Sequence, residues 1–388
     1  MRFISIITGN YPSLAQPMCG TFVQEFARAL VRQGVGVTVI QPVAAHRVLF
    51  RSAYRYHEAE HIDDRASLNI YRPRFLSHSA RDAFKKLGPF NPSRFTFRAF
   101  TAAAQRVMRN ERINAEAIYG HFLYMAGAAA VHLGCELGIP SFPCVGEGEL
   151  WTVRWFGEKQ ARKDLAAASG FIANSCDLKQ TLIHDLGIPE QRIGVFPNGA
   201  DLSVFNPKDK SECRKRFGLP QDSFLVCSAG NFLYKKGVVR VGEAIHGLEG
   251  VAGVFAGSGP MPPQASNTAF CDRVSHDEMP YLISACDVFV LPTLIEGSCN
   301  AIVEAMACGL PIISSNGTFN DDLLTEDMSI RINPLDVAAI RQCITALQSD
   351  KDTLDRMSAA AVIRSKHFDI NRRASRIVEF VREQKKIN

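Results

Sequence analysis

The stretch that decides the fold is LPTLIEGSCNAIVEAMACGLP, residues 291–311. The apolar run that ends at Pro292 predicts a buried strand, and the pattern from Asn300 predicts a helix. The loop between them holds glycine and small residues, so the free N–H groups of the first helical turn form an anion site. Gly297 lets the backbone approach a ligand closely. This order indicates a parallel βαβ unit with a ligand beyond the carboxyl end of its strand.

Two carboxylates accompany this element. Glu296 precedes the predicted helix, and Glu304 lies one turn inside it. Carboxylates accept hydrogen bonds from vicinal hydroxyls, which suits a sugar and a ribose. Alternatively, Glu296 only favours the helix N-terminus electrostatically and Glu304 is a solvated helix residue. The spacing alone leaves both interpretations open.

The same alternation of apolar runs and helical stretches extends along the chain and occurs twice in 388 residues. It predicts an α/β protein with two doubly wound halves. Turn chemistry at Pro197-Asn198-Gly199-Ala200 and the polar stretch after it predict the boundary. We expect a Rossmann-like domain over residues 1–200, a linker over 201–221, and a second Rossmann-like domain over 222–388 that ends in amphipathic helices.

The composition excludes several classes of protein. Hydrophobic residues make up 46% and charged residues 21%, with no apolar run of membrane-spanning length, which excludes disordered, collagen-like and integral membrane chains. The first residues predict a strand rather than a signal peptide. Eleven cysteines without a Cys-x-x-Cys pair suit a reducing compartment and argue against structural zinc. We therefore expect a cytoplasmic protein.

Taken as a whole, residues 291–311 resemble the signature of the family 4 glycosyltransferases of GT-B fold: a glutamate, seven residues, a second glutamate, then Ala-Met-Ala-x-Gly-x-Pro. The resemblance implies two Rossmann-like, doubly wound domains that face each other across a cleft, with C-terminal helices. It also implies that Glu296 contacts the donor sugar and that Glu304 holds the nucleotide ribose. The loop residues between them, Gly297, Ser298, Cys299, Asn300 and Ala301, are expected at the donor.

Further matches extend the resemblance over roughly residues 1–320. Pro197-Asn198-Gly199-Ala200-Asp201 resembles the family's hinge-entry motif, and Ala256-Gly257-Ser258-Gly259-Pro260 its Gly-x-Gly-Pro turn. Gly20 resembles the glycine that faces the donor phosphates in members that assemble bacterial polysaccharides. A dinucleotide fingerprint would continue to a third glycine and open a helix, whereas prolines follow Gly259, so no nicotinamide cofactor is expected.

The loop at residues 230–237 is the expected diphosphate site. The family usually has arginine where Asn231 stands and lysine where Lys236 stands, and both neutralise the leaving diphosphate. Here only the lysine is present. Either Lys235 compensates for the missing arginine, or the leaving diphosphate is stabilised less than in other members of the family. The alternative for both lysines is an ordinary surface position.

In the first half, His121 ends a predicted strand and resembles a histidine that the family often has there, although a lone histidine is commonly structural. Relatives carry His-Gly-x-Asp after the next strand, where this chain has Gly146 and Glu149. Without that imidazole, Glu147 and Glu149 become candidates for holding the acceptor hydroxyl. A solvated loop position is the alternative for one of them.

These features predict a retaining hexosyltransferase that moves a sugar from a UDP- or GDP-sugar to a lipid-linked or polysaccharide acceptor, with Glu296, Lys236 and His121 as catalytic residues. No Asp-x-Asp motif follows a strand, because Asp63-Asp64 and Asp321-Asp322 are adjacent pairs, so we expect no metal and no cofactor. A sugar-nucleotide 2-epimerase and a non-catalytic sugar-nucleotide-binding assembly protein remain alternatives.

The positive charge is regional. Residues 46–112 hold 14 Lys and Arg and 6 Asp and Glu, a local net charge of +8 against +5 for the whole chain. Seven of these cations interleave with phenylalanines: Arg72, Arg74, Arg81, Lys85, Lys86, Arg94 and Arg98. A solvated helix face with core aromatics would explain the pattern, and so would peripheral attachment to an anionic membrane surface, which is where a lipid-linked acceptor lies. No nucleic-acid-binding motif accompanies the patch, so we expect no nucleic acid partner.

Overall fold

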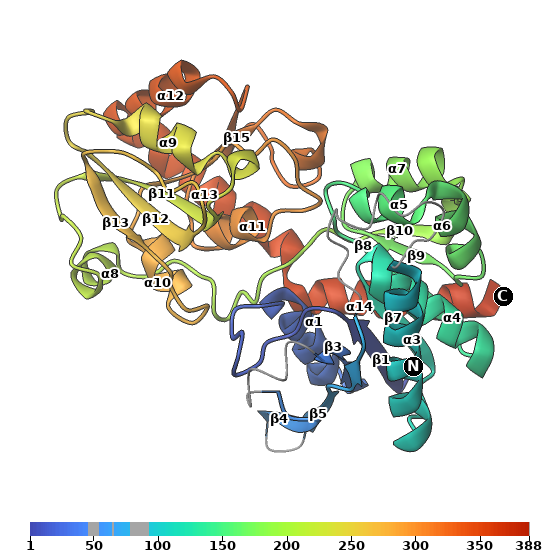
Figure 1. The fold of residues 1–388 in the computed structure, drawn as a ribbon. Helices are drawn as coiled ribbons and strands as arrows, with labels where there is room; N and C mark the ends of the chain where they lie inside the picture. The colour runs from blue at the N-terminus through green and yellow to red at the C-terminus, as the bar shows by residue number, and fades with distance from the viewer. Residues whose placement is uncertain (46–53, 64–65, 78–92, 388) are drawn as a thin grey trace. The chain divides into compact units, whose positions relative to one another are not determined.

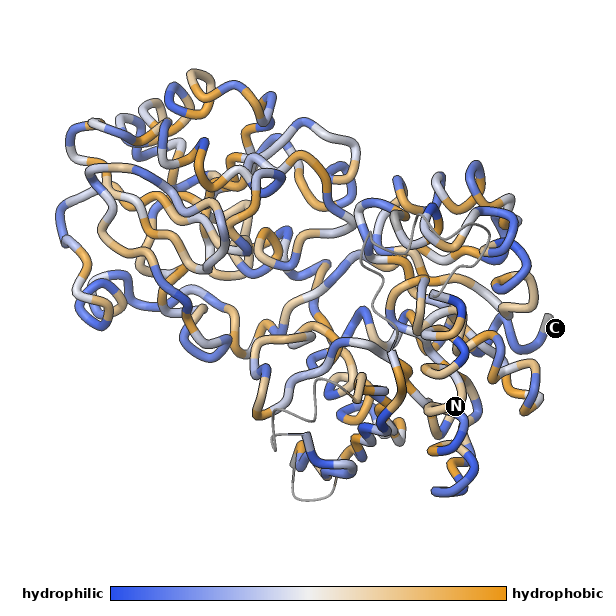
Figure 2. Tube along the Cα trace, viewed as in Figure 1, coloured by the Kyte–Doolittle hydropathy of each residue, from blue (hydrophilic) through white to orange (hydrophobic). Residues whose placement is uncertain are grey.

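The protein is described by a computed structural model that covers residues 1–45, 54–63, 66–77 and 93–387. The chain forms two compact units, residues 1–196 with 371–388 and residues 197–370. Each unit is built on a mainly parallel sheet with helices packed on it (Figure 1). Hydrophobic residues concentrate in the central strands of each unit, and hydrophilic residues in loops and on outer helix faces (Figure 2).

The first sheet has the order β10-β9-β8-β7-β1-β2-β5-β4 among the described residues, and only the β4–β5 pairing is antiparallel. Strand order reverses between β1 and β7, where Thr8 pairs with His121. Loops diverge at such a switch point and leave room for a ligand. The strands are β1 (Phe3–Thr8), β2 (Gly36–Ile40), β4 (His57–Asp63), β5 (Ala66–Tyr71), β7 (Ala117–His121), β8 (Ser141–Val145), β9 (Phe171–Ala173) and β10 (Ile193–Val195), with the separate pair β3 (Val43–Ala44) and β6 (Arg74–Phe75).

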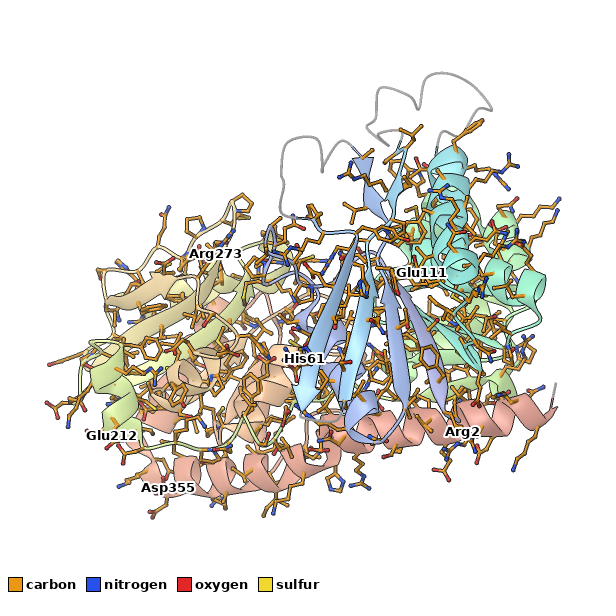
Figure 3. The ribbon with its side chains drawn as sticks, turned by 90° about the horizontal axis from the view of Figure 1, so that it is seen from below. Arg2, His61, Glu111, Glu212, Arg273 and Asp355 are labelled. Atoms are coloured by element: carbon orange, nitrogen blue, oxygen red, sulfur yellow. The ribbon has the colours of Figure 1, made fainter. Side chains whose placement is uncertain are left out.

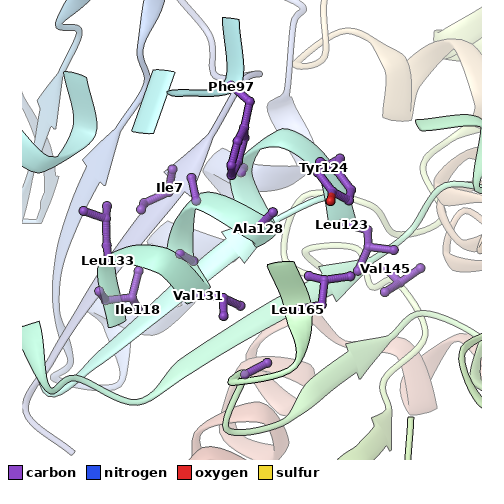
Figure 4. Close-up of a cluster of buried hydrophobic side chains, with 14 of the residues drawn as sticks. Ile7, Phe97, Ile118, Leu123, Tyr124, Ala128, Val131, Leu133, Val145 and Leu165 are labelled. Atoms are coloured by element: carbon purple, nitrogen blue, oxygen red, sulfur yellow. The ribbon is translucent and has the colours of Figure 1, made fainter. Parts of the chain in front are cut away.

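Helices of the first unit bury one apolar stripe each. In the first of them, Val23, Phe26, Ala27 and Leu30 repeat at helical spacing and are all buried. Figure 4 shows another core cluster of this unit, which includes Ile7 and Ile118 of the sheet and Phe97 and Val131 of two later helices. The helices are α1 (Thr21–Arg32), α3 (Ser93–Asn110), the distorted turn η2 (Leu123–Gly127), α4 (Ala128–Leu137), α5 (Trp151–Phe156), α6 (Glu158–Leu165), α7 (Cys176–Leu186) and α14 (Ile370–Ile387).

The second sheet has the order β13-β12-β11-β14-β15-β16, with every pairing among the described residues parallel. Its strand order reverses between β11 and β14. Helices α9 and α12 lie side by side on one face (Figure 1). The elements are α8 (Lys210–Arg216), β11 (Phe224–Asn231), α9 (Val238–Ile245), β12 (Val251–Ser258), β13 (Thr268–Asp272), α10 (Met279–Ser284), β14 (Val288–Leu291), α11 (Asn300–Ala307), β15 (Ile312–Ser315), β16 (Ser329–Ile332), α12 (Val337–Ser349) and α13 (Lys351–Ser365).

Residues 201–221, expected as a linker, lie within the second unit. They contain α8, which is anchored by Arg214. The buried guanidinium of Arg214 donates to a carboxylate oxygen of Asp287 at 2.7 Å and to the Ala285 carbonyl at 2.9 Å. This ion pair holds α8 to the loop that leads into β14.

The last helix also departs from the expected division, because from Asn371 onward α14 belongs to the first unit. Arg373 is buried, and its guanidinium donates to the Phe196 carbonyl and to Oδ1 of Asn174 at 3.2 Å. Ile377 and Val381 are buried on the same helix. An amphipathic stripe predicts that such a helix packs, but it does not say against which unit.

In the basic region, residues 46–112, only some of the described cations are exposed to solvent. Arg72 is 2% exposed, and its guanidinium donates to Gln41, Glu58 and the Pro12 carbonyl, so it is a structural residue. Arg98 is exposed on α3, while Phe97 and Phe100 of the same helix are core residues. Arg81, Lys85 and Lys86 lie outside the described residues.

We predict that Arg214→Ala lowers the free energy of unfolding by about 3 kcal/mol, because it leaves the largely buried Asp287 carboxylate with only the more exposed Lys210 among its described cation partners and removes the donor to the Ala285 carbonyl. Arg216→Ala is the matched control in the same helix. Arg216 pairs with Glu278 at the surface, so its loss costs at most about 1 kcal/mol. Urea unfolding of the two variants measures the difference. Equal losses would contradict the anchoring role of Arg214.

Candidate functional site

The carboxyl ends of β11 and β14 meet at the switch point of the second sheet. The loops that follow them are joined through the backbone. The Lys235 carbonyl accepts hydrogen bonds from the Leu294 N–H at 2.8 Å and from Oγ1 of Thr293 at 3.1 Å. A Cβ on Gly237 would stand 2.5 Å from the Pro292 carbonyl oxygen, so only glycine fits this close approach.

This join brings Lys236 and Glu296 together, 60 residues apart in sequence. The Lys236 ammonium forms an ion pair with Oε1 of Glu296, and both side chains are mostly buried. Burial opposes the charge on Lys236, but the ion pair with the Glu296 carboxylate favours it, and the pKa of Lys236 lies above its usual value. The lysine is therefore a fixed cation at the strand ends.

The N-terminal turn of α11 lies beside this pair. Cys299 stands at the N-cap, and its side chain makes no capping bond. Burial, with a smaller contribution from Glu296, raises the pKa of the Cys299 thiol to about 12, so the thiol is neutral. Oδ1 of Asn300 is buried with no hydrogen-bond partner among the described residues. Glu304 is half-buried one turn later, and its carboxylate also contributes to the raised pKa of the Cys299 thiol.

The Pro-Asn-Gly motif supports the loop before α11. The Asn198 N–H donates to Oγ of Ser298, and Nδ2 of Asn198 donates to the Ser298 carbonyl, both at 2.9 Å. Ser298 was expected to contact a donor, yet its hydroxyl already accepts this bond. Gly297 and Ala301 flank the same turn, buried and half-buried.

Asn231 and Lys235 are exposed at the end of β11 and in the loop after it. In the adjacent strand, a Cβ on Gly257 would stand 1.9 Å from the Gly230 carbonyl oxygen, which explains the glycine of the Gly-x-Gly-Pro turn. A further cation, Arg273, follows β13 and is labelled in Figure 3. Its Nε donates to Oγ of Ser258 at 2.6 Å, and Ser258 pairs with Asn231 in the sheet. Sequence analysis missed Arg273 because no motif marks it.

The carboxyl edge of the first sheet forms a second, separate site. His121 ends β7, is 4% exposed and shares a 3.0 Å hydrogen bond between its Nδ1 and the Tyr119 hydroxyl. Burial, with a smaller effect of Arg373, lowers the pKa of His121 to about 3, so the ring is neutral. His121 lines a pocket of about 820 Å³ together with Asn10 and Glu147.

The sequence did not distinguish Glu147 from Glu149, but the structure gives their carboxylates different surroundings. Oε1 of Glu147 accepts from the Leu123 N–H at 3.0 Å and Oε2 from the Gly146 N–H at 3.2 Å. Burial nevertheless raises its pKa to about 7. Glu149 is exposed and is not among the described residues that line the pocket. At Gly146 a Cβ would stand 2.6 Å from Nδ2 of Asn174, so no histidine fits there unless that amide moves.

Gly20 occupies the N-cap of α1 with φ of +78°. A Cβ there would stand 2.4 Å from the Asn10 carbonyl oxygen, which lies just beyond β1. The glycine therefore brings the N-terminus of α1 against the carboxyl edge of the first sheet.

Sequence analysis missed the other residues of the pocket. Trp155 and Phe156 come from α5, Tyr124 from η2, and Thr152 from the first turn of α5. Among the described residues no group of three or more His, Cys, Asp or Glu side chains is placed to hold a metal ion.

The chain is thus a two-unit α/β protein in which candidate site residues lie at the carboxyl edge of each mainly parallel sheet. Residues 209–363 match the sequence model for glycosyl transferases group 1, and residues 19–204 match that for glycosyltransferase family 4. The two matched regions lie in tandem and together span most of the chain, which therefore belongs to the glycosyltransferases of GT-B type.

Curated relatives agree with this assignment. The chain is 26% identical over 358 residues to TuaC of Bacillus subtilis, a provisionally assigned teichuronic acid biosynthesis glycosyltransferase, and covers 89% of each chain. It is 25% identical over 257 residues to a D-inositol 3-phosphate glycosyltransferase of Thermomonospora curvata, covering 58% of this chain and 59% of that one.

Solved structures show the same fold. Sucrose-phosphate synthase from Thermosynechococcus elongatus superposes with a TM-score of 0.77 at 17% identity over all of both chains. HepE of Anabaena in complex with UDP-glucose gives 0.72 at 16% identity, covering 99% of this chain and 100% of that one. The expected GT-B fold class is confirmed.

The raised pKa of Glu147 makes stability depend on pH. Because the folded state favours the protonated carboxyl, its contribution to the free energy of unfolding is full below about pH 4.5 and is lost as pH rises through about 7. His121 acts in the opposite sense, since its neutral ring contributes fully above about pH 6.5 and loses that contribution as pH falls towards about 3. The two trends overlap, so only a comparison with a variant isolates Glu147.

We predict that, from about pH 5 to about pH 8, the wild type loses about 2 kcal/mol of unfolding free energy relative to Glu147→Gln. The variant keeps His121, so the contribution of the ring cancels. Urea unfolding of both proteins across this range provides the measurement. Parallel pH profiles would show that Glu147 titrates normally.

Proposed function

We propose that the chain is a retaining glycosyltransferase that moves a hexose from a nucleoside diphosphate sugar, UDP- or GDP-linked, to a lipid-linked or polysaccharide acceptor, without a divalent cation. The observation that carries the proposal is the Lys236–Glu296 pair at the switch point of the second sheet, beside the N-terminus of α11. Retention follows from the family resemblance.

The pair supports a donor site because it supplies both charges that the chemistry uses. Lys236 is a fixed cation that stabilises a departing diphosphate. When the diphosphate takes its place at Lys236, the Glu296 carboxylate is released and accepts a hydrogen bond from a sugar hydroxyl. Glu304, half-buried one turn later, accepts from the ribose. The unpartnered Oδ1 of Asn300 is a further acceptor in the same turn.

Acceptor recognition belongs to the first unit in this proposal, with His121 and Glu147 at the pocket. The Glu147 carboxyl, whose pKa is about 7, is able to exchange a proton near neutral pH, whereas the His121 imidazole, whose pKa is about 3, stays neutral there and acts as a hydrogen-bonding group. The existence of this second pocket favours transfer over the 2-epimerase alternative, since an epimerase has no acceptor to bind. The relative TuaC, named for teichuronic acid biosynthesis, and the UDP-glucose complex of HepE support a polysaccharide product and a UDP-sugar donor.

We predict that Lys236→Ala weakens donor binding at least about tenfold, because it removes the cation that faces the diphosphate. Lys235→Ala is the matched control, since its side chain is exposed and its contribution to the site is its backbone carbonyl. Calorimetry with UDP and GDP ranks the two variants. Equal or reversed losses would place the diphosphate elsewhere.

The catalytic proposal is tested by nucleotide release across UDP- and GDP-sugars, with and without membrane lipid extract. We expect acceptor-dependent release that persists in excess EDTA and falls at least about tenfold in Glu304→Ala, since a lost hydrogen bond to a charged group costs about 1.5–3 kcal/mol. Glu304 is the better test than Glu296, whose loss would also unpair Lys236.

Three outcomes would contradict the proposal. Donor consumption that yields an isomeric nucleotide sugar would indicate the epimerase. Tight donor binding without turnover would indicate a binding protein. Loss of transfer in EDTA that magnesium restores would contradict metal independence.

Peripheral attachment to an anionic membrane is part of the proposal, because a lipid-linked acceptor would lie at that surface. None of the described helices is long and apolar enough to cross a membrane. Arg98 and Arg74 are exposed, and each cation near an anionic surface contributes about 1 kcal/mol.

We predict binding to anionic vesicles that declines as salt rises and is reduced by neutralising Lys85, Lys86, Arg94 and Arg98 together. The matched control neutralises Arg72 alone, which is buried, and is expected to affect folding rather than vesicle binding. Sedimentation with vesicles tests this. Binding that is indifferent to salt and to the quadruple substitution would remove the membrane surface from the proposal.

A further inference from the structure

The pocket of the first unit is walled by aromatic rings. Phe100, Phe122, Tyr124, Trp155 and Phe156 line it, from α3, the end of β7, η2 and α5. Tyr124 and Phe156 stack with their centroids 4.5 Å apart and their planes 13° apart. Flat apolar surfaces of this kind match the C–H faces of a sugar ring, whose hydroxyls point outward around its rim.

The wall is held in place by polar contacts behind it. The Tyr124 hydroxyl donates to Asp164 at 2.8 Å, and Asp164 also accepts from Gln160 at 2.7 Å. Nε1 of Trp155 donates to the Ser93 hydroxyl. The rings are therefore oriented before a ligand binds, which lowers the entropic cost of binding.

One hydroxyl at this pocket lacks a partner. Thr152 is 8% exposed, and its Oγ1 is buried with no hydrogen-bond partner among the described residues. Buried hydroxyls are normally paired, so an unpaired one beside a pocket indicates a ligand group that completes it. Thr152 lies one turn of helix before Phe156, on the element that supplies two of the rings.

The charges at the pocket disfavour phosphate. Among the described residues that line it there is no Lys or Arg, and its titratable groups are His121, Glu147 and the Tyr124 hydroxyl. His121 is neutral because of burial, so it offers no positive charge. A phosphate in the pocket would meet a carboxyl and apolar rings, and no described lining residue supplies a compensating cation.

We propose that this pocket binds an uncharged sugar residue of the acceptor, stacked on the aromatic wall and hydrogen-bonded by Thr152, with any phosphate of the acceptor outside it. The inference rests on the proposed glycosyltransferase function and names the acceptor group that the first unit recognises. It makes the end of a growing saccharide, rather than a sugar phosphate, the substrate of the pocket.

The chain provides its own reporter, because Trp151 and Trp155 are its two tryptophans. In Trp151→Phe the fluorescence comes from Trp155 alone. We expect a saturable change on titration with a panel of methyl hexosides and disaccharides, and at least about tenfold weaker binding of the matching hexose 1-phosphates. Calorimetry on the unmodified chain repeats the comparison without the substitution.

The variant Thr152→Val keeps the shape of the side chain and removes the hydroxyl. We expect it to weaken binding of the best glycoside about tenfold while nucleotide binding is unchanged. Thr101→Val is the matched control, since the Thr101 hydroxyl is already bonded to the Phe97 carbonyl and does not line this pocket. Phe156→Leu provides a second variant that removes part of the aromatic wall and is expected to weaken glycoside binding as well.

Equal or tighter binding of the hexose phosphates would overturn the proposal. So would the absence of any response to the glycosides in a protein that still binds nucleotide, and that result would leave the glycosyltransferase function standing. If glycosides bind at Trp155 but the protein shows no nucleotide-dependent turnover, the glycosyltransferase proposal is contradicted and the sugar-binding proposal for this pocket is supported.

Discussion

The proposed donor site depends on one backbone contact, the Lys235 carbonyl that accepts from the Leu294 N–H and the Thr293 hydroxyl. It joins the loops after β11 and β14 at the point where the sheet's strand order reverses. Thr293 is fully buried, and its own carbonyl accepts from the Ser315 hydroxyl of β15, so three neighbouring strands fix the contact. Lys236 and Glu296 lie one and two residues from these backbone groups. Their meeting is therefore set by the sheet and not by the side chains themselves.

That dependence explains which parts of the site the sequence could predict. Both members of the pair were identified, because each stands at a position of the glycosyltransferase family pattern that the sequence resembles, just after a predicted strand. The ion pair between them was not predicted, because a local pattern carries no information about contacts between residues 60 positions apart in the sequence. The same limit applies to Arg214 with Asp287 and to α14, whose apolar stripe predicts burial but does not identify the sheet it covers. Strand positions were predictable because parallel buried strands are continuous apolar runs.

The pocket of the first unit was harder to foresee, for a different reason. Its rings come from three helical elements and the end of a strand, and in the sequence each is an ordinary core aromatic. Glu147 and Glu149 are two residues apart and have the same chemistry, so only the backbone path distinguishes the carboxylate that accepts from Leu123 from the one that faces solvent. The missing partner of Thr152 is a property of packing and has no signal in the sequence.

The two candidate sites have different charges. The site of the second unit contains the Lys236 cation, whereas no described residue that lines the pocket of the first unit is Lys or Arg, and neither site would suit its proposed role with the charge of the other. A cation beside Glu147 would lower its pKa and so make the carboxylate a weaker base towards an acceptor hydroxyl. It would also attract the donor's diphosphate into the first unit. At the second unit, a neutral residue in place of Lys236 would leave both Glu296 and the diphosphate uncompensated. The absence of Lys and Arg among the described lining residues of the pocket thus serves two ends in the proposed function. It selects a neutral sugar, and it keeps the Glu147 carboxyl near the pH at which a proton is most readily passed.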